Sequence, residues 1–136
     1  MKGDVLLQNI QVRGFVPAIA GKSAKEGKRR IKDTIETKMG KNIDGVRKRC
    51  AGKPLWINVE FFLQKNSNHA KKDLDSLSNV LLAVLSKEMS SGKDADPGMN
   101  IIQDDSVVYR MVFEKKIVDS EKDEGLAFSI YEWSYS

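Results

Sequence analysis

The 136-residue chain has few of the residues that build zinc centres and disulfide frameworks. It contains one cysteine, Cys50, and one histidine, His69. A single cysteine cannot form a disulfide within the chain, and structural zinc sites take four ligands, mostly cysteine and histidine. The sequence therefore argues against both kinds of site, and we expect a reducing, cytoplasmic compartment.

Long apolar runs are also missing. No stretch reaches the ~20 apolar residues that a membrane-spanning helix needs. Residues 1–16 show neither the apolar core nor the cleavage pattern of a signal peptide. Apolar residues nevertheless make up 40% of the chain, which is enough for one hydrophobic core. We therefore expect one domain over residues 1–136.

Positive charge is concentrated in one part of the chain. The net charge is +4, but residues 22–49 alone carry 11 lysines and arginines against four acids, a net charge of +7. The rest of the chain is therefore net acidic. A basic segment suits contacts with nucleic-acid phosphates. A solvated helix face is the simpler interpretation, and both stay open.

The hydrophobic pattern predicts a small α/β (α+β) domain with the order strand, helix, strand, helix, strand, strand. The predicted strands cover residues 5–16, 55–64, 106–118 and 125–136, and the predicted helices cover residues 24–50 and 73–89. Ser23 is the expected N-cap of the first helix. We expect one mixed four-stranded sheet with two main helices, in which the last two strands form a hairpin.

The segment "KKDLD", residues 71–75, places two carboxylates at the start of the second helix. Residues two apart in a regular helix do not share a face. Asp73 as an N-cap residue, however, can turn its side chain toward the first turn and converge with Asp75. The helix dipole stabilises each anion there by about 0.3–1 kcal/mol. Ordinary helix capping is the simpler of the two interpretations, and metal binding is the other.

A second acidic pair, Asp104 and Asp105, stands between an apolar approach and the third predicted strand. Carboxylates at a helix start and a strand start can form a pocket for a hard cation, and Mg²⁺ prefers oxygen ligands. A turn with solvated acids is the alternative. The two pairs together make a Mg²⁺ site a hypothesis that either pair alone does not support.

The sequences "KKDLDSLSNVLLAVL" and "IIQDDSVVYRMVFEK" resemble the RusA-type Holliday junction resolvases. Their signature is a basic run, D-L-D-N-L, a helix, and D-D before a strand, and the resemblance covers about residues 69–116. It implies a homodimeric endonuclease, dependent on Mg²⁺ or alternatively Mn²⁺, that resolves four-way DNA junctions by paired nicks in recombination and repair. It implies Asp73, Asp75 and Asp105 as catalytic and metal-binding residues, with Asp104 as a further ligand.

This chain departs from that pattern in ways that bear on activity. D-L-D-N-L reads D-L-D-S-L, the segment between the acidic pairs is longer, and the lysine that the family has four positions after the second Asp is Asn79 here. Asn79 can bond to a phosphate but supplies no charge. A non-catalytic nucleic-acid-binding module with a degenerate site is therefore the second hypothesis. The expected DNA-binding residues are Lys71, Lys72, Asn79, Lys28, Arg29, Arg30 and Lys32.

The sequence holds no direct signal of a dimer. A C2 dimer would match the two-fold symmetry of a four-way junction by presenting two active sites. Four aromatic residues are candidates for its interface or, more simply, for the core: Trp56, Phe62, Tyr131 and Trp133.

Overall fold

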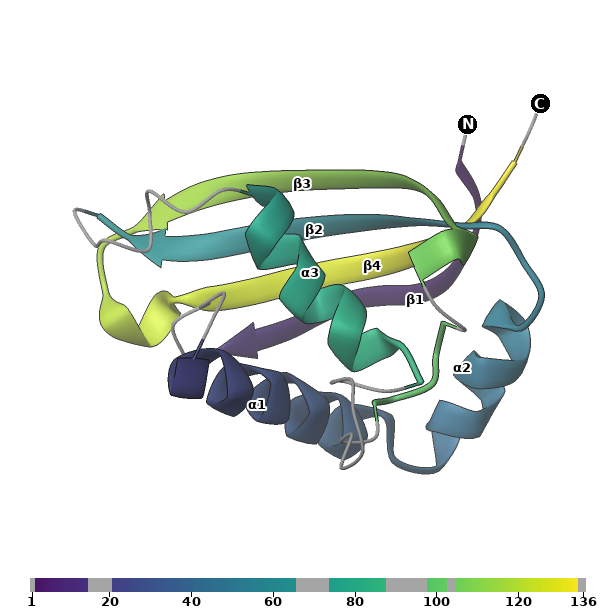
Figure 1. Cartoon of the computed structure of the whole chain (residues 1–136), viewed down its shortest axis with the longest axis horizontal. Coiled ribbons are helices and arrows are strands. Elements are labelled where there is room, and N and C mark those ends of the chain that lie inside the picture. Colours follow the sequence, from purple (N-terminus) through teal and green to yellow (C-terminus); the bar gives the residue numbers. More distant parts are fainter. Residues whose placement is uncertain (1, 15–20, 66–73, 88–97, 103–104, 135–136) are drawn as a thin grey trace.

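The computed structural model describes residues 2–14, 21–65, 74–87, 98–102 and 105–134, and for residues 2–4, 21–25, 74–77 and 105 it describes the backbone alone. Figure 1 shows one sheet with helices on one of its faces. In chain order, with η for short 3₁₀ turns, the elements are β1 (Lys2–Arg13), α1 (Gly21–Met39), η1 (Gly40–Asn42), α2 (Ile43–Cys50), β2 (Leu55–Gln64), α3 (Leu74–Leu85), η3 (Asp105–Val107), β3 (Val108–Val118), η4 (Glu121–Asp123) and β4 (Gly125–Trp133). The expected small α+β fold is confirmed.

The sheet is mixed and four-stranded, as predicted, with the strand order β1-β4-β2-β3. β4 runs antiparallel to both β1 and β2, whereas β2 and β3 are parallel. The predicted hairpin of the last two strands is wrong, because β2 lies between β3 and β4. The burial of β2 explains this order: most of its side chains are buried on both faces, so it takes a central position, while β3 is largely exposed.

Alternation along β2 builds the core, as the sequence predicts. Its five inward residues, Leu55, Ile57, Val59, Phe61 and Leu63, are at most 1% exposed. They share one buried cluster with side chains of the helices, which cover one side of the sheet in Figure 1. From α1 the fully buried Ile31 and Ile35 join this core, and Leu81 joins it from α3.

The first predicted helix is two helices. α1 ends at Met39, and Gly40, with a φ of +50°, stands in the left-handed region that favours glycine at helix ends. The second glycine of this segment, Gly45, lies inside α2 and does not interrupt it. The predicted N-cap at Ser23 is also wrong, since α1 begins two residues earlier.

The other face of the sheet carries its own small aromatic cluster. Trp56 on β2 stacks on Tyr131 on β4, with ring centroids 4.4 Å apart and an interplanar angle of 18°. The Arg13 guanidinium lies 3.3 Å from the centroid of the Phe62 ring, close enough for a cation–π contact. Trp56, Phe62 and Tyr131 are only 8–9% exposed, so these three candidates for an interface are buried within the chain.

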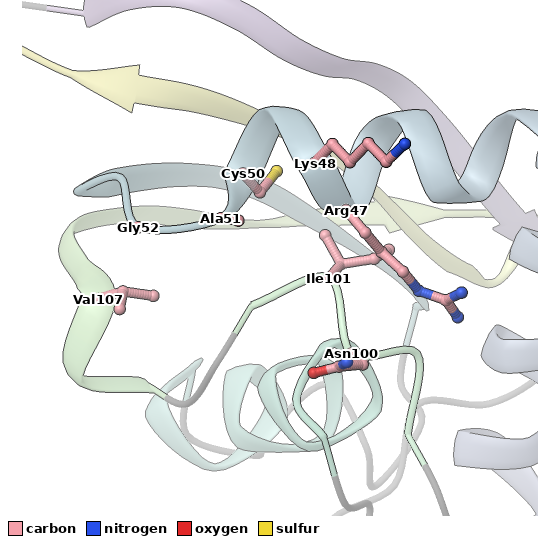
Figure 2. Close-up of a pocket in the computed structure, with 8 residues that line it drawn as sticks. All are labelled: Arg47, Lys48, Cys50, Ala51, Gly52, Asn100, Ile101 and Val107. Atoms are coloured by element: carbon pink, nitrogen blue, oxygen red, sulfur yellow. The ribbon is translucent and has the colours of Figure 1, made fainter.

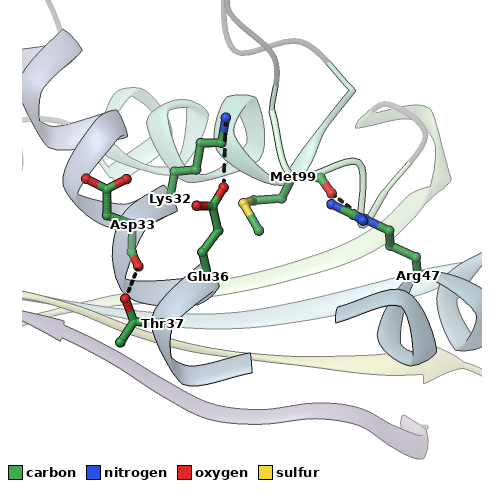
Figure 3. A network of polar contacts seen from close by, with 6 residues as sticks. All are labelled: Lys32, Asp33, Glu36, Thr37, Arg47 and Met99. Atoms are coloured by element: carbon green, nitrogen blue, oxygen red, sulfur yellow. Dashed lines mark hydrogen bonds and ion pairs between the residues drawn. The ribbon is translucent and has the colours of Figure 1, made fainter. Parts of the chain in front are cut away.

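Residues 98–102, which we call the strap, close the end of α3. The backbone N–H groups of all five residues donate to carbonyl oxygens of residues 84–87, at 2.7–3.0 Å. Met99, Ile101 and Ile102 are at most 3% exposed. On its other side the strap accepts a 2.8 Å hydrogen bond from Nε of Arg47 to the Met99 carbonyl (Figure 3). The strap therefore supplies hydrogen-bond donors for carbonyl groups that are left without a partner at the end of a helix.

Candidate functional site

The acidic motif falls on element starts. Asp75 lies in the first turn of α3, and Asp105 opens η3 just before β3. Their side chains, and the whole of Asp73 and Asp104, lie outside the described residues. Among the described side chains, no three Cys, His, Asp or Glu residues come together as a metal-binding group. Convergence of the four carboxylates on one ion therefore stays a prediction.

The β2–α3–β3 crossover sets the backbone positions of Asp75 and Asp105. β2 and β3 run parallel, with Leu55 opposite Val108 and Gln64 opposite Val118. The chain thus leaves the sheet at one end of this strand pair and re-enters it at the other. In Figure 1 the green η3 turn lies at the end of the sheet where β3 begins, whereas α3 starts over the middle of the strands. Each pair's contribution is therefore a separate question for experiment.

Asn79, which stands where the resolvase resemblance implies a lysine, faces solvent. α3 runs unbroken through residues 75–79, so Asn79 follows Asp75 by one turn of regular helix, and its side chain is exposed. The neighbouring Ser78 is 2% exposed, and its hydroxyl has no hydrogen-bond partner within the part of the chain that is described. An exposed Asn79 can reach a phosphate as a neutral hydrogen-bond donor.

The four expected DNA-binding residues of α1 differ in their surroundings. Arg29 and Arg30 are exposed, and Lys28 is half-buried. Lys32 is half-buried and lies 4.0 Å from the carboxylate of Glu36 one turn on (Figure 3). Lys71 and Lys72 lie outside the described residues. Arg29 and Arg30 are therefore the expected phosphate contacts that the structure places on the surface.

Three cations of the basic segment bind the backbone of β1. We call them the β1 clamp: Arg30 Nη2 donates to the Arg13 carbonyl (3.3 Å), Lys38 Nζ to the Gln11 carbonyl (2.8 Å) and Arg49 Nη2 to the Leu6 carbonyl (3.4 Å). Charge that looks free in the sequence thus helps to hold an edge strand against α1 and α2. Sequence spacing carries no signal for such side-chain-to-carbonyl bonds, and the clamp could not be anticipated.

A cavity of about 350 Å³ opens between α2 and the strap (Figure 2). Its polar lining comes from Arg47, Lys48 and Asn100. Its apolar lining includes Ile101 of the strap and Val107 of η3. Arg47 is held in place by the Met99 carbonyl and by a 3.0 Å ion pair with Asp44. The cavity therefore offers positive charge beside the turn that carries Asp105.

Cys50 lies at the end of α2, 3% exposed. Burial raises the pKa of its thiol, and the nearby charges of Arg49 and Lys53 offset part of that rise. The folded state therefore favours the protonated thiol. The stability this contributes is fully present below the pKa of the unfolded thiol, and it is lost as the pH rises through the higher pKa of the folded state.

We expect Cys50 to react with a disulfide reagent at pH 8 at least about 100-fold more slowly in the folded than in the unfolded protein, because burial and a raised pKa both suppress the thiolate. Absorbance of the released thiol, with and without guanidinium chloride, measures this ratio. A Lys41→Cys variant, which adds an exposed thiol in η1, is the control and should react at an unhindered rate. Fast reaction of the folded wild type would contradict the described packing.

No protein-family model matches this sequence, and a search of curated proteins found no similar sequence. None of the helices in the described part of the chain is both long and apolar enough to cross a membrane.

Proposed function

We propose that the protein is a RusA-type, Mg²⁺-dependent endonuclease that resolves four-way DNA junctions as a cytoplasmic homodimer. The observation that carries the proposal is the placement of the motif on the fold. Leu74 and Asp75 of D-L-D lie in the first turn of the helix that follows β2, and Asp105 of D-D opens η3, which leads into the parallel strand β3. The order of elements around the two acidic pairs is the order that the resolvase resemblance implies.

The acidic motif supplies only oxygen ligands, which suits Mg²⁺ and also Mn²⁺. In this proposal Asp73, Asp75 and Asp105 hold the ion, with Asp104 beside them. A bound Mg²⁺ would neutralise charge on the phosphodiester and activate the attacking water. A carboxylate that is not fully used as a ligand would accept the proton from that water. The resemblance implies products with a 5′-phosphate and a 3′-hydroxyl.

Positive side chains must hold DNA against this acidic centre. Arg29 on α1 is exposed, Arg30 is exposed while one of its nitrogens donates to the Arg13 carbonyl, and Lys48 lines the cavity beside η3. Together with Lys71 and Lys72 they would contact phosphates, which positions the DNA without reading its bases. Binding should therefore weaken steeply with salt.

A non-catalytic nucleic-acid-binding module is the second candidate. The exposed Asn79 favours it, because this residue stands where the resemblance implies a lysine and it carries no charge. In that case the acids would cap α3 and form a turn before β3, while the basic surface would bind DNA without cutting it.

Cleavage of a labelled synthetic four-way junction, with and without Mg²⁺, tests the proposal. We expect paired nicks in Mg²⁺, and at least about 100-fold slower cleavage by Asp75→Asn and by Asp105→Asn, since losing a metal ligand removes about 3 kcal/mol or more of transition-state stabilisation. Asp123→Asn, an exposed substitution in η4, is the matched control and should cut normally.

The separate variants also show whether both acidic pairs serve one centre. Loss of activity in both supports a shared site, and loss in only one assigns the chemistry to that end of the crossover. Junction binding without cleavage in Mg²⁺ or Mn²⁺ would establish the binding module instead, and Asn79→Lys would then test whether the missing charge is the cause. If the protein neither binds nor cuts the junction, both proposed functions are ruled out.

A further inference from the structure

The two edges of the sheet differ in what covers their backbone groups. The β1 edge is covered by the β1 clamp, whose cations occupy backbone carbonyls that another strand would otherwise use. β3 forms the other edge and pairs only with β2 among the described strands. Figure 1 shows no described element beyond it. An 11-residue edge strand with no described strand beyond it is a template for a further strand.

The side chains of β3 suit such an addition. Val112 is 37% and Ile117 is 55% exposed, which is unusual for apolar residues in an otherwise well-buried sheet. Pairing with β2 is regular from Arg110 to Val118, so alternate residues of this stretch direct their backbone N–H and C=O groups toward β2 and the residues between them direct theirs toward the other edge. Edge pairing takes its affinity from these backbone bonds and its choice of partner from alternate side chains.

The order of charges on β3 favours a second copy of the same strand. Arg110, Val112 and Glu114 alternate along the face opposite the helices, in register with Trp56, Asn58 and Glu60 of β2. Antiparallel pairing centred on Val112 places Arg110 opposite the partner's Glu114, and Glu114 opposite the partner's Arg110. The two Val112 side chains meet between them. Opposite charges and apolar residues placed directly across a strand pair both stabilise it.

Neighbouring symmetric registers are less favourable. Centring on Phe113 sets Arg110 against the partner's Lys116, and centring on Glu114 or Lys115 sets that residue against its own copy. Like charges directly opposite destabilise a strand pair. Lys116 is in addition already paired with Glu60 of β2 at 2.8 Å. Only the register centred on Val112 joins opposite charges without opposing like ones.

We propose that β3 is the interface of a C2 homodimer, in which two β3 strands pair antiparallel around Val112 and join the two four-stranded sheets into one. The interface is isologous, as two-fold symmetry requires. This inference names the contact for the homodimer of the proposed function, but it stands on the sheet edge and does not require nuclease activity.

Analytical ultracentrifugation over a range of concentrations tests the interface. Wild type should associate reversibly. Glu114→Lys should raise the dimer dissociation constant at least about tenfold, because it opposes two like charges twice in each dimer. Adding Arg110→Glu to that variant restores opposite charges, and we expect the dissociation constant to return to within about threefold of wild type. Glu121→Lys makes the same charge change in exposed η4 and should leave association unchanged.

A Val112→Cys variant tests the register. Its two added thiols face each other in the proposed dimer, and a short thiol-to-thiol crosslinker should join them in high yield, whereas Cys50 is buried. A Lys116→Cys variant should crosslink poorly. Three results would overturn the proposal: a wild type that stays monomeric up to about 1 mM, a dimer that Glu114→Lys does not weaken, or equal crosslinking of the two cysteine variants. Junction cleavage is assayed separately, so failure of the interface and failure of the nuclease proposal are distinguishable.

Discussion

Replacing Gly125 by alanine is expected to lower the free energy of unfolding by at least about 3 kcal/mol. Gly125 opens β4 with a φ of +145°, a conformation that residues with a Cβ rarely adopt. An added Cβ would overlap the carbonyl oxygen of Val12 and lie 2.9 Å from the Cα of Arg13. These are backbone atoms of β1, so the clash cannot be relieved by rotating a side chain.

Chemical denaturation of wild type and Gly125→Ala, followed by circular dichroism, measures the loss. Gly52→Ala is the matched control. Gly52 also has a positive φ, +71°, but no described atom lies within 4 Å of the position that an added Cβ would take. It should lose only the roughly 1–2 kcal/mol that a left-handed backbone costs a residue with a side chain. Equal losses in the two variants would mean that backbone conformation, and not the contact with β1, sets the effect.

Gly98→Ala is expected to destabilise the protein by about 2–4 kcal/mol through the strap. The new Cβ would overlap the carbonyl oxygen of Ser86 and lie 3.0 Å from that of Val84. Both carbonyls accept hydrogen bonds from the strap, so the substitution pushes apart the two segments that these bonds join. The buried Met99 would lose its packing at the same time.

Hydrogen exchange shows where in the chain the destabilisation by Gly98→Ala arises, and how large it is. We expect the amide protons of residues 98–102 to exchange faster in Gly98→Ala, while those of β2 change only by the global loss of stability. Gly45→Ala is the control, and we expect it to raise the free energy of unfolding, not to lower it. Gly45 lies within α2 with only the Arg49 guanidinium near its Cβ position, at 3.8 Å, so alanine should stabilise the helix by about 0.5–1 kcal/mol. Unchanged exchange in the strap would contradict the described contact.

The helices and strands of this fold were easier to predict from the sequence than the pairing of the strands. The alternation of residues 55–64 gave the bounds of β2 correctly, because one face of that strand packs on the helices. Pairing was harder. Sequence proximity favoured a hairpin of β3 and β4, whereas β2, buried on both faces, takes the place between them. The sequence did not predict the strap, since its hydrogen bonds go to carbonyls at a helix end and follow no periodic pattern.

For the candidate site, too, the local structure could be predicted from the sequence, whereas the arrangement in space could not. Local pattern placed Asp75 at the start of a helix and Asp105 at the approach to a strand, and both placements agree with the backbone. Which ends of the sheet these positions occupy follows from the parallel pairing of β2 and β3, which no short motif encodes. Lys38 and Arg49 show a further limit. Their charges counted toward a DNA-binding surface, but their partners are backbone carbonyls of a strand far away in sequence.

The central place of β4 has a consequence for how the chain folds. β2, α3 and β3 are consecutive, so their contacts close shorter loops than the pairing of β1 with β4 and can form earlier. β1 has no strand partner except β4 among the described strands, with Arg13 opposite Gly125 and Lys2 opposite Trp133. It therefore cannot join the sheet until β4 has inserted beside β2. Until that step one edge of β2 stays open, so we expect slow folding and a partly folded intermediate prone to aggregation.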